Sequence, residues 1–370
     1  MMFYKWNKIV LWGVILTALV LIGCTDPVSE EDNSVLIDNR VLVYESTEAP
    51  PMDDPENTIW YDVTTGNIDL GDDEDYADFF GSKTLLVKMM KTADRLYARF
   101  EWVDNDRDRT PNYLYHTFVI DTVGEVDTID TWAAQPSFIV TSTSGVADTS
   151  MMDQDRVAII WDKGNNLGEQ ADCASMCHAT PNILTGQKMY TTGTDSLGTV
   201  AAGTVDVWQW LSGTSDPILK ARDEYWDANG HTNDAEVIPL RTYNFDDITN
   251  LPIYMHRDTF DFSDDILFAS DTVPFDTSLG WPNGQIIPGH VLYENASGSV
   301  ADIDAFAIHA LSSSYGRWMV LMSRPLTTSD PSDIDFSTIT SGDSIQVTVM
   351  IAENSDRLHS GSKPFYVVFP

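Results

Sequence analysis

The chain has 370 residues, of which 57 are Asp or Glu and 21 are Lys or Arg, so its formal net charge is −36. Hydrophobic residues make up 43% and aromatic residues 11%, which excludes a disordered chain because this composition can bury a large core. The charge argues against nucleic acid as a partner, because phosphate binding needs clustered cations. The acids are spread through loops such as residues 72–75. This spread predicts a solvated acidic surface, and the second interpretation is attraction of a basic partner.

The first 23 residues are typical of an export signal. Lys5 and Lys8 precede an apolar run over residues 9–21, which is short for a membrane span. The run then ends in LIGC at residues 21–24, which resembles the bacterial lipobox, where cleavage precedes a cysteine that becomes diacylated. We therefore expect residues 1–23 to be removed and Cys24 to be lipidated; an uncleaved anchor helix is the alternative. Both interpretations place the chain in the bacterial cell envelope, attached to a membrane and facing the periplasm or the exterior.

The mature chain is predicted to be a polar tether over residues 24–40 and one folded domain over residues 41–370. Short apolar runs separated by Thr, Gly, Asp and Pro predict strands throughout that domain. The clearest of these runs cover residues 41–44, 85–89, 96–102, 157–161, 318–323 and 345–352. We predict a mainly β fold, an antiparallel β-sandwich with short helices and long loops.

Two tracts in the middle of the domain, residues 206–211 and 218–226, are predicted as short helices. The Asp-rich stretch over residues 228–288 is predicted to be an irregular insertion in the sandwich. The chain has no phosphate-binding glycine loop ahead of a convincing helix, so nucleotide chemistry is not supported.

The strongest functional signal is the CASMCH run at residues 173–178, which holds the only cysteines besides Cys24. Haem c is attached through C-x-x-C-H, where two thiols form thioethers with the porphyrin vinyl groups and the adjacent imidazole binds iron. Here the spacer has three residues, a variant also known for haem c. The run predicts one covalent haem c anchored by Cys173 and Cys177, with His178 as the proximal iron ligand.

The cysteine pair allows three other interpretations. A disulfide between Cys173 and Cys177 is feasible in an oxidising compartment, but it closes a very short loop and stabilises little. A zinc site needs more ligands than two thiols and one imidazole. A redox-active dithiol lacks the thioredoxin-like βαβ pattern around it.

The chain resembles the haem-binding domain family related to the γ subunit of ethylbenzene dehydrogenase, over about residues 60–369. The resemblance rests on DRLYARFEWVD at 94–104, DRVAIIW at 155–161, CASMCH at 173–178, DVWQW at 206–210, IPG at 287–289, GRWMV at 316–320 and RPL at 324–326. It implies an immunoglobulin-like or DOMON-like β-sandwich that holds haem between loops at one end, in proteins that serve molybdenum enzymes of the dimethylsulfoxide reductase type. The best-known members bind haem b through Met and Lys, so the cysteine motif prevents direct transfer of those two ligands.

The second iron ligand is predicted to be His359, which lies in a loop before the last strand, where the family tends to place a polar ligand or pocket residue. Met189, which follows His178 by 11 residues, is the alternative, and a surface His or a core Met is the ordinary interpretation of each. Trp208 and Trp210 lie two residues apart, so on a strand they face the same way. They form either a wall of the haem pocket or part of the core. The five other histidines are interpreted as surface or structural residues.

The sequence thus predicts a membrane-anchored c-type cytochrome that transfers electrons and is not itself an enzyme. Its expected partners are a redox protein, either another cytochrome or a molybdoenzyme, and the membrane through the lipid anchor. One alternative is a haemless surface-binding β-sandwich lipoprotein. Another is the haem subunit of a molybdopterin oxidoreductase complex.

Overall fold

The computed structural model describes residues 39–71, 84–105, 107, 113–119, 129–134, 138–141, 148–151, 154–163, 205–227, 230–258, 266–280, 286–311, 315–352 and 360–370. The chain divides into Met1–Ser34 and Val35–Pro370, and all described residues lie in the second unit. The predicted signal, Cys24 and most of the tether lie outside the described residues. Within the described part, no helix has the length and apolarity needed to cross a membrane.

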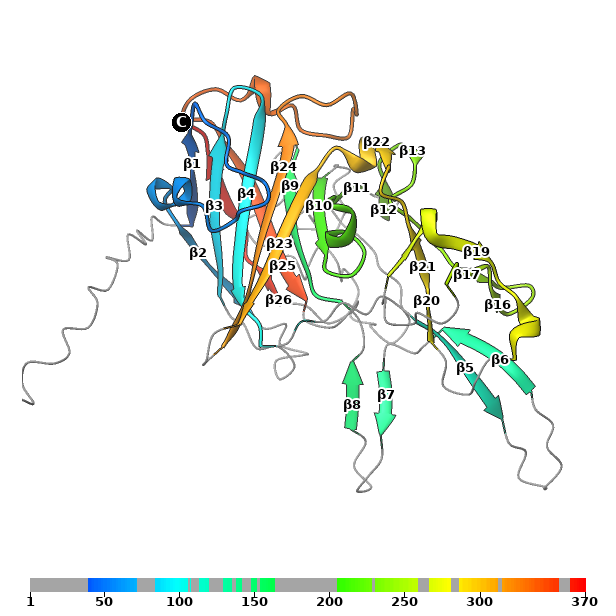
Figure 1. Ribbon diagram of the computed structural model, residues 1–370. Coiled ribbons are helices and arrows are strands. Elements are labelled where there is room, and N and C mark those ends of the chain that lie inside the picture. Colours follow the sequence, from blue (N-terminus) through cyan, green and yellow to red (C-terminus); the bar gives the residue numbers. More distant parts are fainter. Residues whose placement is uncertain are drawn as a thin grey trace, which may run out of the picture. The chain divides into compact units, whose positions relative to one another are not determined.

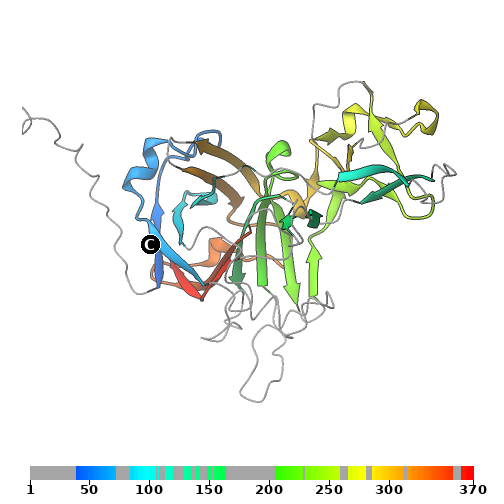
Figure 2. The ribbon, with the colours of Figure 1, turned by 90° about the horizontal axis from the view of Figure 1, so that it is seen from below.

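The described chain is a β-sandwich whose two layers are halves of one 13-stranded sheet (Figures 1 and 2). The β9 layer consists of β9 (Arg156–Asp162), β10 (Val205–Leu211), β11 (Arg222–Asp227), β12 (Gly230–Asn233), β25 (Ser344–Ala352), β26 (Ser360–Ser362) and β27 (Phe365–Val368). The β4 layer consists of β1 (Arg40–Glu45), β2 (Gly66–Gly71), β3 (Thr84–Lys91), β4 (Arg95–Val103), β23 (Asp304–Leu311) and β24 (Gly316–Pro325). The predicted fold class is therefore confirmed, and each of the six predicted strands is present.

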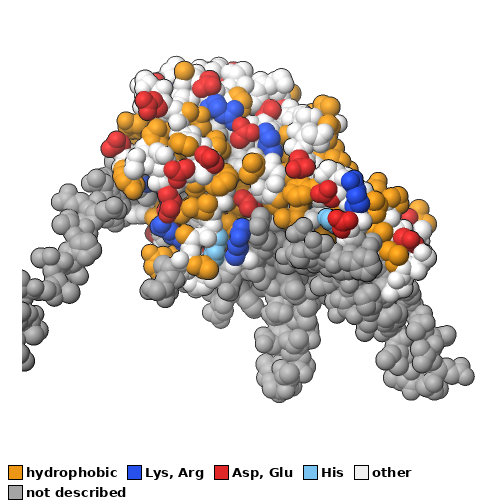
Figure 3. All heavy atoms as spheres, in the orientation of Figure 1, with side chains coloured by type: hydrophobic (Ala, Val, Ile, Leu, Met, Phe, Trp, Pro, Cys, Tyr) orange, Lys and Arg blue, Asp and Glu red, His pale blue; other side chains and the backbone are white. Residues whose placement is uncertain are grey.

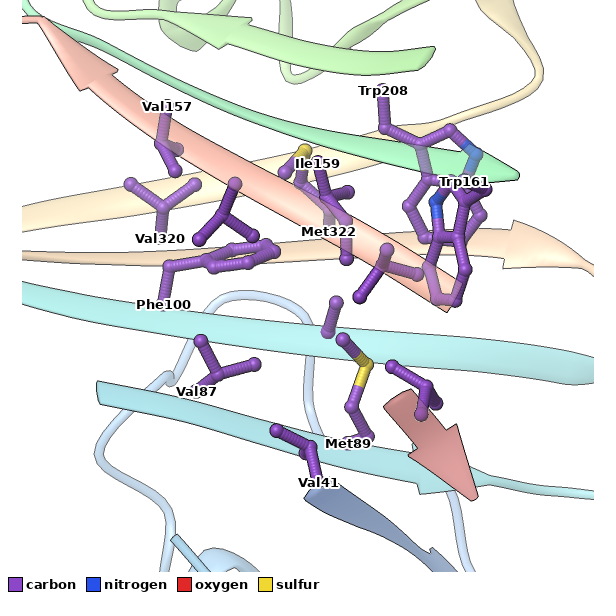
Figure 4. Packing of buried hydrophobic residues seen from close by; sticks show 14 of the residues in the cluster. Val41, Val87, Met89, Phe100, Val157, Ile159, Trp161, Trp208, Val320 and Met322 are labelled. Carbon is purple, nitrogen blue, oxygen red and sulfur yellow. The ribbon is translucent and has the colours of Figure 1, made fainter. Parts of the chain in front are cut away.

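Strand β1 joins the two layers along one edge. Its first three residues pair in parallel with β27, and its last three pair in parallel with β3. Strands β2 and β26 make a second, antiparallel connection between the layers. The sheet therefore folds over along this edge, and the inner faces of its halves bury one apolar core (Figure 4).

Small sheets of two or three strands make up much of the rest of the described chain. They are β13 (Glu236–Ile238) with β22 (Ser297–Gly298); β14 (Arg241–Tyr243) with β21 (His290–Leu292) and β18 (Leu267–Phe268); β15 (Phe245–Asp246) with β16 (Leu251–Pro252); β17 (Tyr254–His256) with β19 (Thr272–Pro274); β5 (Tyr113–Val119) with β6 (Ile129–Ala134) and β20 (Ile286–Pro288); and β7 (Phe138–Thr141) with β8 (Asp148–Met151). The stretch predicted as an irregular insertion thus contains many short strands.

The prediction of short α-helices is wrong for the described residues. Residues 205–211 form β10, and residues 222–227 form β11, which pair with each other in an antiparallel hairpin. Both faces of β10 are buried, so its apolar residues show no period that separates a strand from a helix. The helical elements described are 3-10 turns: η1 (Thr58–Asp62), η3 (Asp216–Ile218), η4 (Ala269–Asp271), η5 (Thr277–Leu279), η6 (Ser299–Ala301) and η7 (Phe336–Thr338).

The described surface agrees with the predicted distribution of charge. On the face seen in Figure 3, Asp and Glu side chains are scattered among other side chains and do not gather in one patch. Acidic side chains scattered in this way keep that face solvated.

Candidate functional site

Most of the predicted site residues lie outside the described part of the chain. These are Cys24, Cys173, Cys177, His178, Met189 and His359. The described strands nevertheless fix where the segments that carry them begin and end. Residues 164–204 run from the end of β9 to the start of β10, and these ends are neighbours because Asp162 pairs with Val205.

The segment of His359 is bounded at the other end of the same sheet. Strand β25 ends at Ala352, which pairs with Arg156 at the start of β9, and β26 resumes at Ser360 beside Ile351. Strand β9 has seven residues, so its two ends lie about 20 Å apart. The segments of His178 and His359 therefore leave the described sheet at opposite ends of β9.

Trp208 and Trp210 face the same way on β10, as predicted, and both side chains are fully buried between the layers. The ring of Trp208 lies 5.3 Å from that of Trp161 (Figure 4). Trp210 crosses the sandwich and packs edge-on against Trp318 at 5.0 Å. These contacts are those of a core, and contact of either ring with a haem stays a prediction.

The outer face of the β9 layer carries a second apolar group, here called the outer apolar cluster: Ala158, Ile160, Val205, Val207, Trp226 and Met350. All of these residues belong to β9, β10, β11 and β25, and each is buried. The outer face of the β4 layer differs, because its cluster includes Trp60, Met52 and Ile59 from the segment between β1 and β2. A sheet with two apolar faces must be covered on both.

A buried charge cluster, which the sequence did not reveal, joins the layers beside Trp208. Arg324 of β24 donates to Asp206 of β10 at 2.7 and 3.0 Å and to Asp223 of β11 at 3.1 Å. Asp333 lies 3.2 Å from the same guanidinium. Arg324 also stands 4.9 Å from the centre of the Trp208 ring, a cation–π contact.

The three carboxylates of this cluster could offer oxygens to a metal ion, because these atoms lie within 4.8 Å of one another. Arg324 already contacts all three, so the guanidinium supplies the positive charge that an ion would bring. Burial alone lowers the pKa of Arg324, but the aspartates outweigh it and the net direction is upward. Burial raises the pKa of Asp223 well above its ordinary value, although Arg324 opposes this. The cluster is therefore a structural ion network between the layers.

Asp234 lies next to this network and gives a testable dependence on pH. Burial, followed by Asp333 and Asp330, raises the pKa of Asp234 to about 8, and Ser332 donates to it at 3.1 Å. A carboxyl whose pKa is higher in the folded than in the unfolded state stabilises the folded protein at low pH. This stabilisation is lost as the pH rises from the unfolded pKa to the folded pKa. Replacing Asp234 by asparagine should therefore remove up to about 2 kcal/mol of the fall in unfolding free energy between pH 6.5 and 8.

The check on Asp234 is urea unfolding of both proteins at pH 6.5 and pH 8. This window avoids His290, whose pKa is lowered to about 3 by burial and by Arg241 and Arg222, so that its own effect on stability changes only below pH 6.5. Asp258→Asn, at an exposed position, should follow the wild type. If the unfolding free energy fell equally from pH 6.5 to pH 8 in the wild type and in Asp234→Asn, Asp234 would be ionised in the folded protein throughout this window.

A cavity of about 250 Å³ lies between the edge of the β9 layer and the small sheet β14–β21–β18. Its lining residues are Arg222, Asn233, Glu236, Leu240, Arg241, Tyr243, His290 and Val300. His290 was interpreted from the sequence as a surface or structural residue, and the structure buries it, with 9% of its surface exposed. A signal for this site was the charge of Arg222 and Arg241 in a chain with few basic residues.

Comparison with known proteins gives one family and several distant structural likenesses. No curated protein matches the chain. Among solved structures, the chain is similar to a family 9 carbohydrate binding module from Caldicellulosiruptor kristjanssonii in complex with glucose, with 10% identity and a TM-score of 0.32 over 90% of this chain and 95% of that chain. It is also similar to a putative carbohydrate-binding protein from Bacteroides uniformis ATCC 8492, with 7% identity and a TM-score of 0.34 over 90% of this chain and 99% of that chain.

The family comparison covers most of the described sandwich. The model of the family described as ethylbenzene dehydrogenase matches residues 57–363, from η1 to just beyond β26. Because the match spans well over half of the chain, the chain belongs to the ethylbenzene dehydrogenase family.

Proposed function

We propose that this chain is a lipid-anchored c-type cytochrome that transfers electrons through one covalently bound haem. The observation that carries the proposal is the CASMCH run at residues 173–178, in a chain whose remaining cysteine is Cys24. The two thiols and one imidazole match the donor set of haem c in type and order. The family supports a haem subunit, since the sequence resemblance on which haem binding was inferred falls within the matched residues.

The export signal and the thiols support each other. Haem c is attached outside the cytoplasm, and the lipobox at residues 21–24 sends the chain there. Acylated Cys24 would hold the domain on a membrane face of the cell envelope. The tether would then let the domain reach a redox partner in the periplasm or at the exterior.

The described strands carry a buried apolar cluster that suits the wall of a porphyrin site. The segment with Cys173, Cys177 and His178 begins at β9 and ends at β10, and the outer apolar cluster is built from these two strands and their neighbours. Val205 and Val207 start β10 on this face, directly after the segment. We infer that these residues bury one face of the haem and exclude water from it.

The bound haem supplies a one-electron couple, and the chain tunes it. Apolar side chains around a metal centre lower the local dielectric and shift its potential, and the axial ligands shift it further. His178 would bind the iron on one side, and either His359 or Met189 on the other. If His178 and one of these residues together held the iron, the haem would supply electron transfer rather than substrate chemistry, so we assign no catalysis to this chain.

The test is expression of the full chain with the haem c maturation machinery. The wild type should show a Soret band, keep its haem through denaturing electrophoresis, and yield a peptide spanning residues 173–178 with the mass of one added haem. Cys173→Ala/Cys177→Ala should lose all three signals, because no thioether can form. Membrane fractions should carry the haem stain, and an unlipidated form exported by a cleavable signal should carry it in solution.

The matched control is Ser175→Ala, in the spacer of the same motif, which should keep the haem. His359→Ala and Met189→Ala then test the second ligand, since only loss of the true ligand should change the spin state of the iron. A colourless mature protein with Cys173 bridged to Cys177 would overturn the assignment and favour a haemless surface-binding module.

A second candidate, favoured by the family match, is the haem subunit of a molybdopterin oxidoreductase. In that case the same haem would pass electrons to or from a catalytic partner, and the two should co-purify from detergent-solubilised membranes of the native host. A haem-loaded protein that purifies alone would support the independent cytochrome.

A further inference from the structure

We infer that the cavity beside β11 is a binding site for a small organic monocarboxylate with an apolar or aromatic body. The site does not depend on the haem. Its volume of about 250 Å³ is lined by cationic, aromatic and aliphatic residues together. Such a mixture suits a ligand with one charged end.

The register of the small sheet places the key side chains on one face. Tyr243 of β14 pairs with His290 of β21, and Arg241 lies two residues before Tyr243. Residues two apart on a strand point the same way, so Arg241, Tyr243 and His290 share a face. The rings of Tyr243 and His290 meet edge to face, with centres 5.6 Å apart.

A second arginine reaches the cavity from the large sheet. Arg222 of β11 donates to Gln209 at 3.1 Å and to Asn233 at 2.9 Å, which holds its guanidinium at the cavity wall. It also pairs with Glu224 at 2.5 Å, so part of its charge is compensated. Arg241 donates to Thr214 at 3.4 Å, and its guanidinium lines the same cavity.

His290 supplies the polar group that the cavity leaves unsatisfied. Its Nδ1 atom is buried and has no hydrogen-bond partner among the described residues. Buried polar atoms are almost always satisfied in native proteins, so such an atom at a cavity wall indicates a missing ligand or water. Burial, followed by the positive charges of Arg241 and Arg222, lowers the pKa of His290 to about 3 and keeps the ring neutral. A neutral imidazole can donate from Nδ1 to a carboxylate oxygen.

The rest of the wall favours an organic body over a bare inorganic ion. Leu240 and Val300 are aliphatic and belong to the small core behind the cavity. Tyr243 adds an aromatic surface at the half-exposed side. Glu236, also in the wall, disfavours a second negative charge on the ligand. A monocarboxylate meets all of these conditions.

Benzoate is the probe, and neutral benzamide is its matched analogue. Titration calorimetry of the full mature protein at pH 7 should show saturable binding of benzoate and at least roughly tenfold weaker binding of benzamide, because a charge-assisted hydrogen bond is lost. Arg241→Gln should weaken the binding of benzoate to the same extent, and Arg241→Lys should retain part of the affinity. Arg257→Gln, in the same region but outside the cavity wall, should bind as the wild type does.

Three results would overturn the inference. They are equal affinity for benzoate and benzamide, unchanged affinity for benzoate in a folded Arg241→Gln, and tighter binding of sulfate than of benzoate. If Arg241→Gln does not fold, Tyr243→Leu provides the second variant, because Tyr243 is 44% exposed and its loss should be tolerated. Tyr243→Leu should weaken the binding of benzoate more than the binding of acetate. Equal losses for both probes would also overturn the aromatic part of the assignment.

Discussion

Replacing Arg324 by methionine should lower the free energy of unfolding by about 3–5 kcal/mol, the range for removing one partner of a buried ion network. Arg324 is fully buried, and it donates to Asp206, Asp223 and the Ile334 carbonyl. Without the guanidinium, the buried carboxylates of Asp206, Asp223 and Asp333 lose their counter-charge. The measurement is urea unfolding followed by tryptophan fluorescence at pH 7.

The loss should also depend on pH in a defined direction. Burial raises the pKa of Asp223 and of Asp333, so these two carboxyls can protonate at low pH, and Arg324→Met should be less damaging at pH 5 than at pH 8. Adding Asp206→Asn and Asp223→Asn to Arg324→Met should recover part of the loss, because the uncompensated charges are then removed. Arg257→Met is the control, since Arg257 donates to Ser270 at an exposed site. A loss below about 1 kcal/mol, the level of a surface pair, would mean that the network is not buried in solution.

The sequence predicted the strands of the sandwich because their patterns are local. Leu96, Phe100 and Trp102 alternate with residues of the opposite face, and β4 is found there. It could not predict β10, since the run from Val205 to Leu211 is buried on both faces and has no distinguishing period. The pairing of the layers through β1 also depends on contacts between distant strands, which no local pattern encodes.

The charge cluster was missed for a similar reason. Arg324 is 118 residues from Asp206 and 101 from Asp223, so nothing local links them. One signal was present: Asp206 shares the inner face of β10 with Trp208 and Trp210, and a carboxylate in that position requires a buried partner. The predicted haem motif is the opposite case, because its residues are contiguous and the prediction needs no contact between distant strands.

Replacing Trp210 by alanine should lower the free energy of unfolding by about 3–5 kcal/mol, as other large-to-small changes of buried aromatics do. Trp210 is fully buried, and its ring lies 5.0 Å from Trp318 and 6.4 Å from Trp102 across the sandwich. Alanine would leave a cavity between the layers, beside Trp318 and Trp102. Trp210→Phe should cost less, because most of the aromatic contact remains. Tyr61→Ala, at a side chain that is 69% exposed, should change stability by no more than about 0.5 kcal/mol.

The same strand also offers a test of the face on which the proposed haem lies. Trp210 points into the core, whereas Val207 points to the outer apolar cluster. If the haem packs on the outer face, Val207→Thr should shift the reduction potential and the Soret maximum of the loaded protein, because a hydroxyl replaces a methyl group beside it. Trp210→Phe should leave both unchanged while lowering stability. The reverse pattern would place the haem against the inner face of β10, and the tryptophans would then form a wall of its pocket.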